Sequence, residues 1–199
     1  MPAFDIPSEA WYIDRVFRKG VSLLKRNQSL RITCASLCLA LALVLPFLTG
    51  QIPRIGNMLA PMHIPVLLCG FLCGWGWGGA VGFLAPLLRS LLFGVPVFFP
   101  MAVSMSAELC VYGVLSGLLY RRLPDGLLWT YVSLIAAMIA GRLVWGGVRL
   151  LCAGLTGAAF PFSAFLAGAV TQAVPGIVLQ LLLVPALVRS VEKVTGLTK

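Results

Sequence analysis

Six apolar segments fill most of this chain and limit what it can fold into. They cover residues 32–48, 62–75, 78–93, 101–120, 127–152 and 162–188. Hydrophobic residues make up 60% of the chain and charged residues only 11%, whereas a soluble domain has about 25% charged residues. This number of charges is too small to cover a water-facing surface of a chain of this size. The apolar surface must therefore face lipid. The composition predicts an all-α integral membrane protein with six transmembrane helices.

The stretch from residue 57 to residue 94 departs from the pattern of full-length membrane spans. It holds the second and third apolar runs, both shorter than the about 20 residues that a membrane-spanning helix needs. The sequence GWGWGG separates the two runs. Because glycine and tryptophan interrupt the pattern here, we expect two short or tilted helices rather than one.

The positions of the basic residues predict the orientation. With six spans and a cytoplasmic N-terminus, eleven of the fifteen lysines and arginines fall in cytoplasmic segments, and only Arg54 falls in an outer loop. Positive residues are enriched on the cytoplasmic side of membrane proteins. The chain is therefore expected to have both termini in the cytoplasm (N-in/C-in), in a bacterial cytoplasmic membrane.

Residues 1–30 form a charged leader before the membrane domain. Ser8 and Glu9 suit a helix start, and apolar residues then recur at near-helical spacing among basic residues. This pattern predicts a short amphipathic helix on the membrane surface. The alternative is a loosely ordered basic leader that only sets topology. The membrane domain would then span 31–190, followed by a cytoplasmic tail at 191–199.

Polar residues inside the apolar segments are the candidate functional residues, because charges within a membrane are costly and usually have a role. In the expected topology they all fall between the membrane centre and its outer surface. The candidate substrate-binding residues are Asn57, His63, Arg89, Glu108, Tyr112, Arg142, Trp145, Arg149 and Gln172.

These residues predict an outward-facing cavity for an anionic ligand. Three arginines and one glutamate leave an excess of positive charge. Arginine can bind a carboxylate with two parallel hydrogen bonds. Tyr112 and Trp145 would supply apolar or stacking walls. A structural alternative pairs Arg89 with Glu108 and directs Arg149 to the outer interface, and this alternative is compatible with a cavity.

Other chemistries find little support in the sequence. The six cysteines all lie in apolar runs and, with one histidine in the chain, do not predict a zinc site or any other metal site. The chain contains no P-loop, HExxH or GxSxG motif, so no ATPase or hydrolase site is expected, and no cofactor. The basic residues form no stripe with interleaved aromatics, which argues against nucleic acid as a partner.

Three strings carry a resemblance to a known family. LAPMHIPVLLCGFLCG, GFLAPLLRSLLFG and AELCVYGVLSGLLY resemble the substrate-binding subunits (S components) of energy-coupling factor (ECF) vitamin transporters. The resemblance covers roughly residues 31–190. It implies that the chain binds a water-soluble vitamin near the outer face, under the loop between the first two spans. It also implies partnership with a membrane coupling protein and two ATPases, which hydrolyse ATP in its place.

The family docks on its coupling protein through a small-xxx-small pattern in the first span. The nearest matches here are Ser36 with Ala40 and, overlapping them, Cys38 with Ala42. Small residues at this spacing permit close approach of two helices in lipid.

The sequence thus favours a transport subunit for a carboxylate-bearing vitamin, with pantothenate as the first candidate and niacin or folate-like compounds as others. The alternative is a small integral-membrane enzyme or assembly factor. The sparse set of nucleophiles and acid–base residues argues against that alternative.

Overall fold

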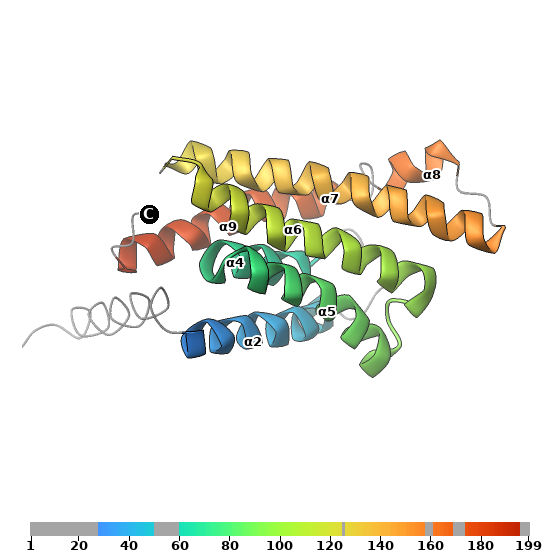
Figure 1. Cartoon of the computed structure of the whole chain (residues 1–199), viewed down its shortest axis with the longest axis horizontal. Coiled ribbons are helices and arrows are strands. Elements are labelled where there is room, and N and C mark those ends of the chain that lie inside the picture. The colour runs from blue at the N-terminus through green and yellow to red at the C-terminus, as the bar shows by residue number, and fades with distance from the viewer. Residues whose placement is uncertain (1–27, 50–59, 125, 158–160, 169–173, 196–199) are drawn as a thin grey trace, which may run out of the picture.

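The computed structural model describes residues 28–49, 60–124, 126–157, 161–168 and 174–195, and all of their regular elements are helical (Figure 1). The elements are α2 (Gln28–Val44), η1 (Leu45–Thr49), α4 (His63–Cys73), α5 (Trp75–Phe93), η2 (Phe98–Ala102), α6 (Val103–Arg122), α7 (Leu127–Thr156), α8 (Phe162–Leu166) and α9 (Val174–Thr195). The all-α prediction is confirmed for these residues. The leader at 1–27 and the loop at 50–59 lie outside them.

Four helical stretches are long and apolar enough to cross a membrane: Gln28–Phe47, Trp75–Phe93, Phe98–Arg122 and Leu127–Thr156. Two further apolar helices, His63–Cys73 and Val174–Ser190, are shorter. A multi-pass membrane protein follows from the four long helices. Six spans and the N-in/C-in orientation stay predictions.

Two described helices cover parts of the last apolar segment, 162–188. α8 ends at Leu166 and α9 begins at Val174, with residues 169–173 outside the described part. Pro175 lies in the first turn of α9. Backbone N–H groups in the first turn have no partner within the helix, so proline loses no hydrogen bond there. Proline therefore favours a helix start at this point.

α4, α5 and α6 pack together through glycine. Gly74 ends α4 with a φ of 100°, which a residue with a side chain rarely adopts, so α5 folds back beside α4. Gly78 of α5 then meets Gly113 of α6 so closely that a Cβ on either would collide with the other's backbone. Figure 1 shows α5 and α6 side by side. The GWGWGG sequence thus supplies both the turn and a side-chain-free surface for α6.

α2 and α4 pack through cysteine. The thiols of Cys34 and Cys38 lie beside those of Cys73 and Cys69, so that each α2 cysteine meets one from α4. All four are free thiols, and all but Cys34 are fully buried. Small apolar side chains at one-turn spacing let the two helices approach closely.

We predict that Gly113→Ala destabilises the helix bundle because its new methyl group has no space against Gly78. Overpacking of this kind costs about 1–3 kcal/mol. Thermal unfolding of the purified protein in detergent would measure the loss as a lower Tm. Gly147→Ala is the matched control, because a Cβ at Gly147 meets nothing within 4 Å. An equal Tm for both variants would contradict the tight crossing of α5 and α6.

Candidate functional site

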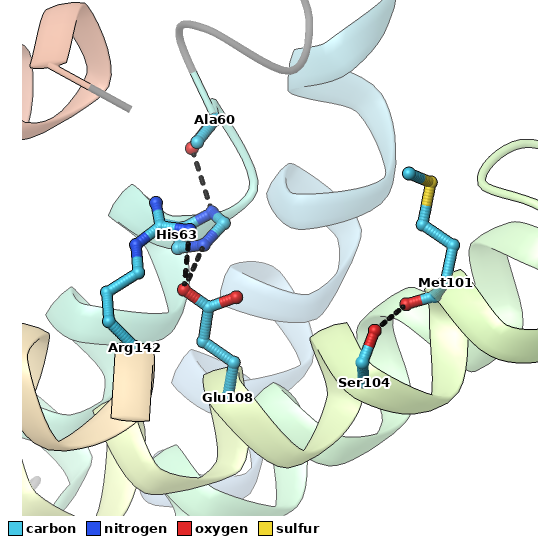
Figure 2. Close-up of polar contacts among 6 residues, drawn as sticks. All are labelled: Ala60, His63, Met101, Ser104, Glu108 and Arg142. Carbon is cyan, nitrogen blue, oxygen red and sulfur yellow. Dashed lines mark hydrogen bonds and ion pairs between the residues drawn. The ribbon is translucent and has the colours of Figure 1, made fainter. Parts of the chain in front are cut away.

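Three charged or titratable side chains from three helices meet at one point in the bundle (Figure 2). Glu108 of α6 lies at the centre. Its Oε1 is 3.2 Å from an Nη of Arg142 on α7 and 3.6 Å from Nε2 of His63 on α4. Glu108 is 1% exposed and His63 3%, while the Arg142 side chain is 17% exposed. We call these three residues the polar cluster.

Local structure at the start of α4 sets the orientation of His63. Ala60 has a φ of 45° and begins the turn that leads into the helix. Its carbonyl accepts the backbone N–H of His63 at 3.0 Å and lies 3.1 Å from the ring Nδ1. These two contacts fix the ring so that Nε2 faces Glu108, as Figure 2 shows.

Tyr112 completes the buried face of α6. Ser104, Glu108 and Tyr112 are spaced four residues apart, and all three are buried, as helical periodicity predicts. The Tyr112 ring contacts the His63 ring edge to face at 5.3 Å, and its hydroxyl lies close to Glu108 and Arg142. A Cβ at Gly141 would collide with the Tyr112 ring. Glycine at 141 therefore lets α7 bring Arg142 to the polar cluster.

Several polar atoms at this place have no hydrogen-bond partner among the described residues. They are Nε2 of His63, Oε1 of Glu108, the hydroxyl of Tyr112 and Nε of Arg142. Glu108 and Arg142 are thus in ionic contact without an aligned hydrogen bond. Buried donors and acceptors are nearly always paired, so this concentration makes the polar cluster the candidate site for a polar ligand.

Arg89 lies elsewhere, and the structural alternative that pairs it with Glu108 is wrong. One Nη of Arg89 donates a hydrogen bond of 2.7 Å to the carbonyl of Leu43, and the guanidinium packs over the rings of Phe47 and Phe93. Pro46 has no N–H, so the helix lacks one donor to the carbonyls of the preceding turn, where Ala42 and Leu43 lie four and three residues earlier. Arg89 supplies such a donor and joins the end of α2 to α5.

Trp145 and Arg149 form a second group on α7. The Trp145 ring stacks with Phe165 of α8 at 6.3 Å between centroids, and the Arg149 guanidinium lies over Trp145 at 6.0 Å. Gly146 and Gly168 leave the room that these rings occupy. The sequence predicted Trp145 as a stacking wall, but the partner Phe165 was missed because it lies twenty residues away.

Two of the predicted residues, Asn57 and Gln172, lie outside the described residues. Gln180 of α9 was not among the predicted site residues, yet it is 1% exposed and its Oε1 has no hydrogen-bond partner within the described segments. Its signal was the four-residue spacing of Gly168, Gln172, Gly176 and Gln180.

The two small-residue pairs of α2 face opposite ways. Ser36 and Ala40 are exposed, whereas Cys38 and Ala42 are buried in the bundle. A partner helix can reach only the first pair. Cys38 and Ala42 instead pack within the hydrophobic core of the bundle.

The described residues hold no group of three or more His, Cys, Asp or Glu side chains that suits a metal ion. The polar cluster contains one carboxylate, one imidazole and one guanidinium, and a guanidinium has no lone pair for a metal. Its chemistry suits recognition of a polar ligand.

Comparison with protein families decides the class of this chain. The family described as "ECF transporter, substrate-specific component" matches residues 30–188. The chain belongs to this family of S components. No curated protein and no solved structure matches it. As an S component it is a substrate-specific transport subunit and not an enzyme, and membership implies association with an ECF module.

We predict that Arg89→Gln lowers the stability of the S component, because Leu43 loses a charged donor and two aromatic rings lose their cation. Hydrogen bonds that involve a charged group contribute about 1.5–3 kcal/mol. Thermal unfolding in detergent measures the effect. Arg122→Gln, which removes an exposed arginine at the end of α6, is the control and should leave Tm nearly unchanged. Equal stability of the two variants would show that the bond to Leu43 contributes nothing.

Proposed function

We propose that this S component binds a carboxylate-bearing micronutrient of vitamin size at the outer face of the membrane for ATP-driven uptake. Pantothenate is the first candidate, followed by niacin and folate-like compounds. The observation that carries the proposal is the polar cluster, in which Arg142 is mostly buried and its Nε has no acceptor among the described residues. A ligand carboxylate would accept from this guanidinium.

His63, Glu108, Tyr112 and Arg142 are the proposed core of the binding site. Arg142 binds the carboxylate, while Glu108 holds Arg142 in position and links it to His63. The hydroxyl of Tyr112 is available to a second polar group of the ligand, since it has no partner in the described part of the chain. Trp145 and Arg149 lie within two turns of Arg142 on α7 and supply a wall that suits an apolar or planar part of the ligand.

Asn57, Arg89 and Gln172 are further proposed contributors to the site. Asn57 and Gln172 belong to segments that the structure does not describe. Arg89 is directed to α2, so its contribution to binding would act through the packing of α2 on α5.

The partners proposed for uptake are a membrane coupling protein and two ATPases, in a bacterial cytoplasmic membrane. The absence of a P-loop from the sequence agrees with ATP hydrolysis on separate subunits. Ser36 and Ala40 on the exposed face of α2 are the proposed contact with the coupling protein, because two small residues one turn apart allow a partner helix to pack closely.

The binding proposal predicts that the purified protein binds pantothenate and that Arg142→Ala weakens binding by about 10²-fold or more. Removing one partner of a buried charge pair costs about 2–5 kcal/mol and leaves Glu108 without its cation. Isothermal titration calorimetry with the protein in detergent measures both affinities.

Arg122→Ala is the matched control, since it removes the same charge from an exposed position at the far end of α6. Binding of the cationic vitamin thiamine, with no response to pantothenate, nicotinate or folate, would overturn the proposed ligand class. Unchanged affinity in Arg142→Ala would remove that arginine from the site.

The docking proposal predicts that Ala40→Leu lowers vitamin uptake in cells at least tenfold while the purified variant binds ligand as the wild type does. A leucine at this position keeps a coupling-protein helix at a distance. Ile139→Phe, a similar enlargement at an exposed position of α7, is the control. Normal uptake by Ala40→Leu would place the contact on another face.

A further inference from the structure

The hydrogen-bond geometry of His63 determines which of its ring nitrogens carries a hydrogen. The carbonyl oxygen of Ala60 can only accept, so Nδ1 at 3.1 Å must donate. In a neutral imidazole the other nitrogen, Nε2, then has a lone pair and no hydrogen. This lone pair faces Oε1 of Glu108 at 3.6 Å.

Two acceptors that face each other in a buried site repel each other. Both side chains are almost completely shielded from solvent, so water cannot relieve the repulsion. One additional proton converts the contact into an attraction between an imidazolium and a carboxylate. The same proton changes the formal charge of His63, Glu108 and Arg142 together from zero to +1.

We infer that this S component takes up one proton with its ligand, held on His63 against Glu108, and that this proton makes the site selective for a monoanionic carboxylate. The inference rests on the proposed function. Without the proton, Arg142 and Glu108 neutralise each other and the polar cluster offers an anion no net attraction. With the proton, the cluster has one excess positive charge, which the ligand carboxylate offsets within the bundle.

The surroundings of His63 leave Glu108 as its charged partner. α4 packs against α2, α5, α6 and α9. α6 contributes Glu108 and the Tyr112 ring, and α7 contributes Arg142 through Glu108. Among the described residues of α2, α5 and α9, no charged side chain forms an ion pair or hydrogen bond with His63. Arg89 of α5 is directed to Leu43.

The sign of the pH effect follows from the uptake of a proton. Ligand binding and proton uptake favour each other, so affinity rises as pH falls and weakens as pH rises. Uptake of about one proton corresponds to a change of about tenfold in affinity per pH unit. The ligand carboxylate stays ionised throughout the neutral range.

Nuclear magnetic resonance of the full chain can observe the proton directly, because His63 is the only histidine. Protein labelled with ¹⁵N-histidine and purified with a histidine-free tag gives signals from one imidazole. In the wild type at pH 6.0, with or without pantothenate, we expect hydrogens on both ring nitrogens. In Glu108→Gln, whose amide donates to Nε2, we expect a hydrogen on Nδ1 alone. A neutral wild-type ring at this pH would overturn the inference, even if no ligand binds.

Calorimetry in buffers with different ionisation heats counts the protons taken up on binding. At pH 7.5 the wild type should take up a substantial fraction of one proton per pantothenate, whereas Glu108→Gln and His63→Gln should take up none. Ser133→Ala is the control, because Ser133 is buried on α7 nine residues before Arg142 and bonds only to its own helix. Its proton uptake should match the wild type.

The results separate the two proposals. Pantothenate binding without proton uptake at pH 6.5, 7.5 and 8.5 overturns the proton inference and leaves the proposed function intact. Failure to bind pantothenate, nicotinate or folate, together with a protonated His63, overturns the ligand class and leaves the protonated contact established.

Discussion

The ionic contact of Glu108 is the interaction on which the arrangement of this site depends. A carboxylate in an apolar helix bundle is stable only with a cation beside it, and Arg142 supplies that cation. The contact joins α6 to α7, and His63 adds α4. Because three helices supply one residue each, a shift of any one of them would change the site. Under the proposed function, such a shift would change the affinity of the site for its ligand.

Close helix packing makes this contact possible. Gly78 and Gly113 let α5 and α6 approach each other, and Gly141 lets α7 lie against the ring of Tyr112. Glycine at these positions costs helix propensity, but in lipid the close packing that it permits is a main source of helix association. The unusually glycine-rich sequence around residue 76 therefore contributes to the geometry of a site on the other helices.

The arginines show how one residue type takes different roles in the same bundle. Arg142 pairs with Glu108, Arg89 donates to the carbonyl of Leu43, and Arg149 lies over Trp145. Each arrangement stabilises a guanidinium in an apolar setting by a different contact: a carboxylate, a backbone oxygen or an aromatic face. Only Arg142 belongs to the polar cluster, so the number of arginines within the apolar segments overstates the positive charge at that cluster.

The sequence by itself determined the helical class, the membrane environment and the buried face of α6. These depend on composition and on a period of 3.6 residues, which are local properties. It also identified Glu108, His63 and Arg142 as candidates, because polar residues stand out in apolar runs. Only the tertiary structure decided that Arg142 rather than Arg89 meets Glu108, that Ser36 and Ala40 face outward, and that Phe165 stacks on Trp145. The physical reason is that partner choice depends on the rotation and crossing of helices distant in sequence, and glycine contacts between those helices set both.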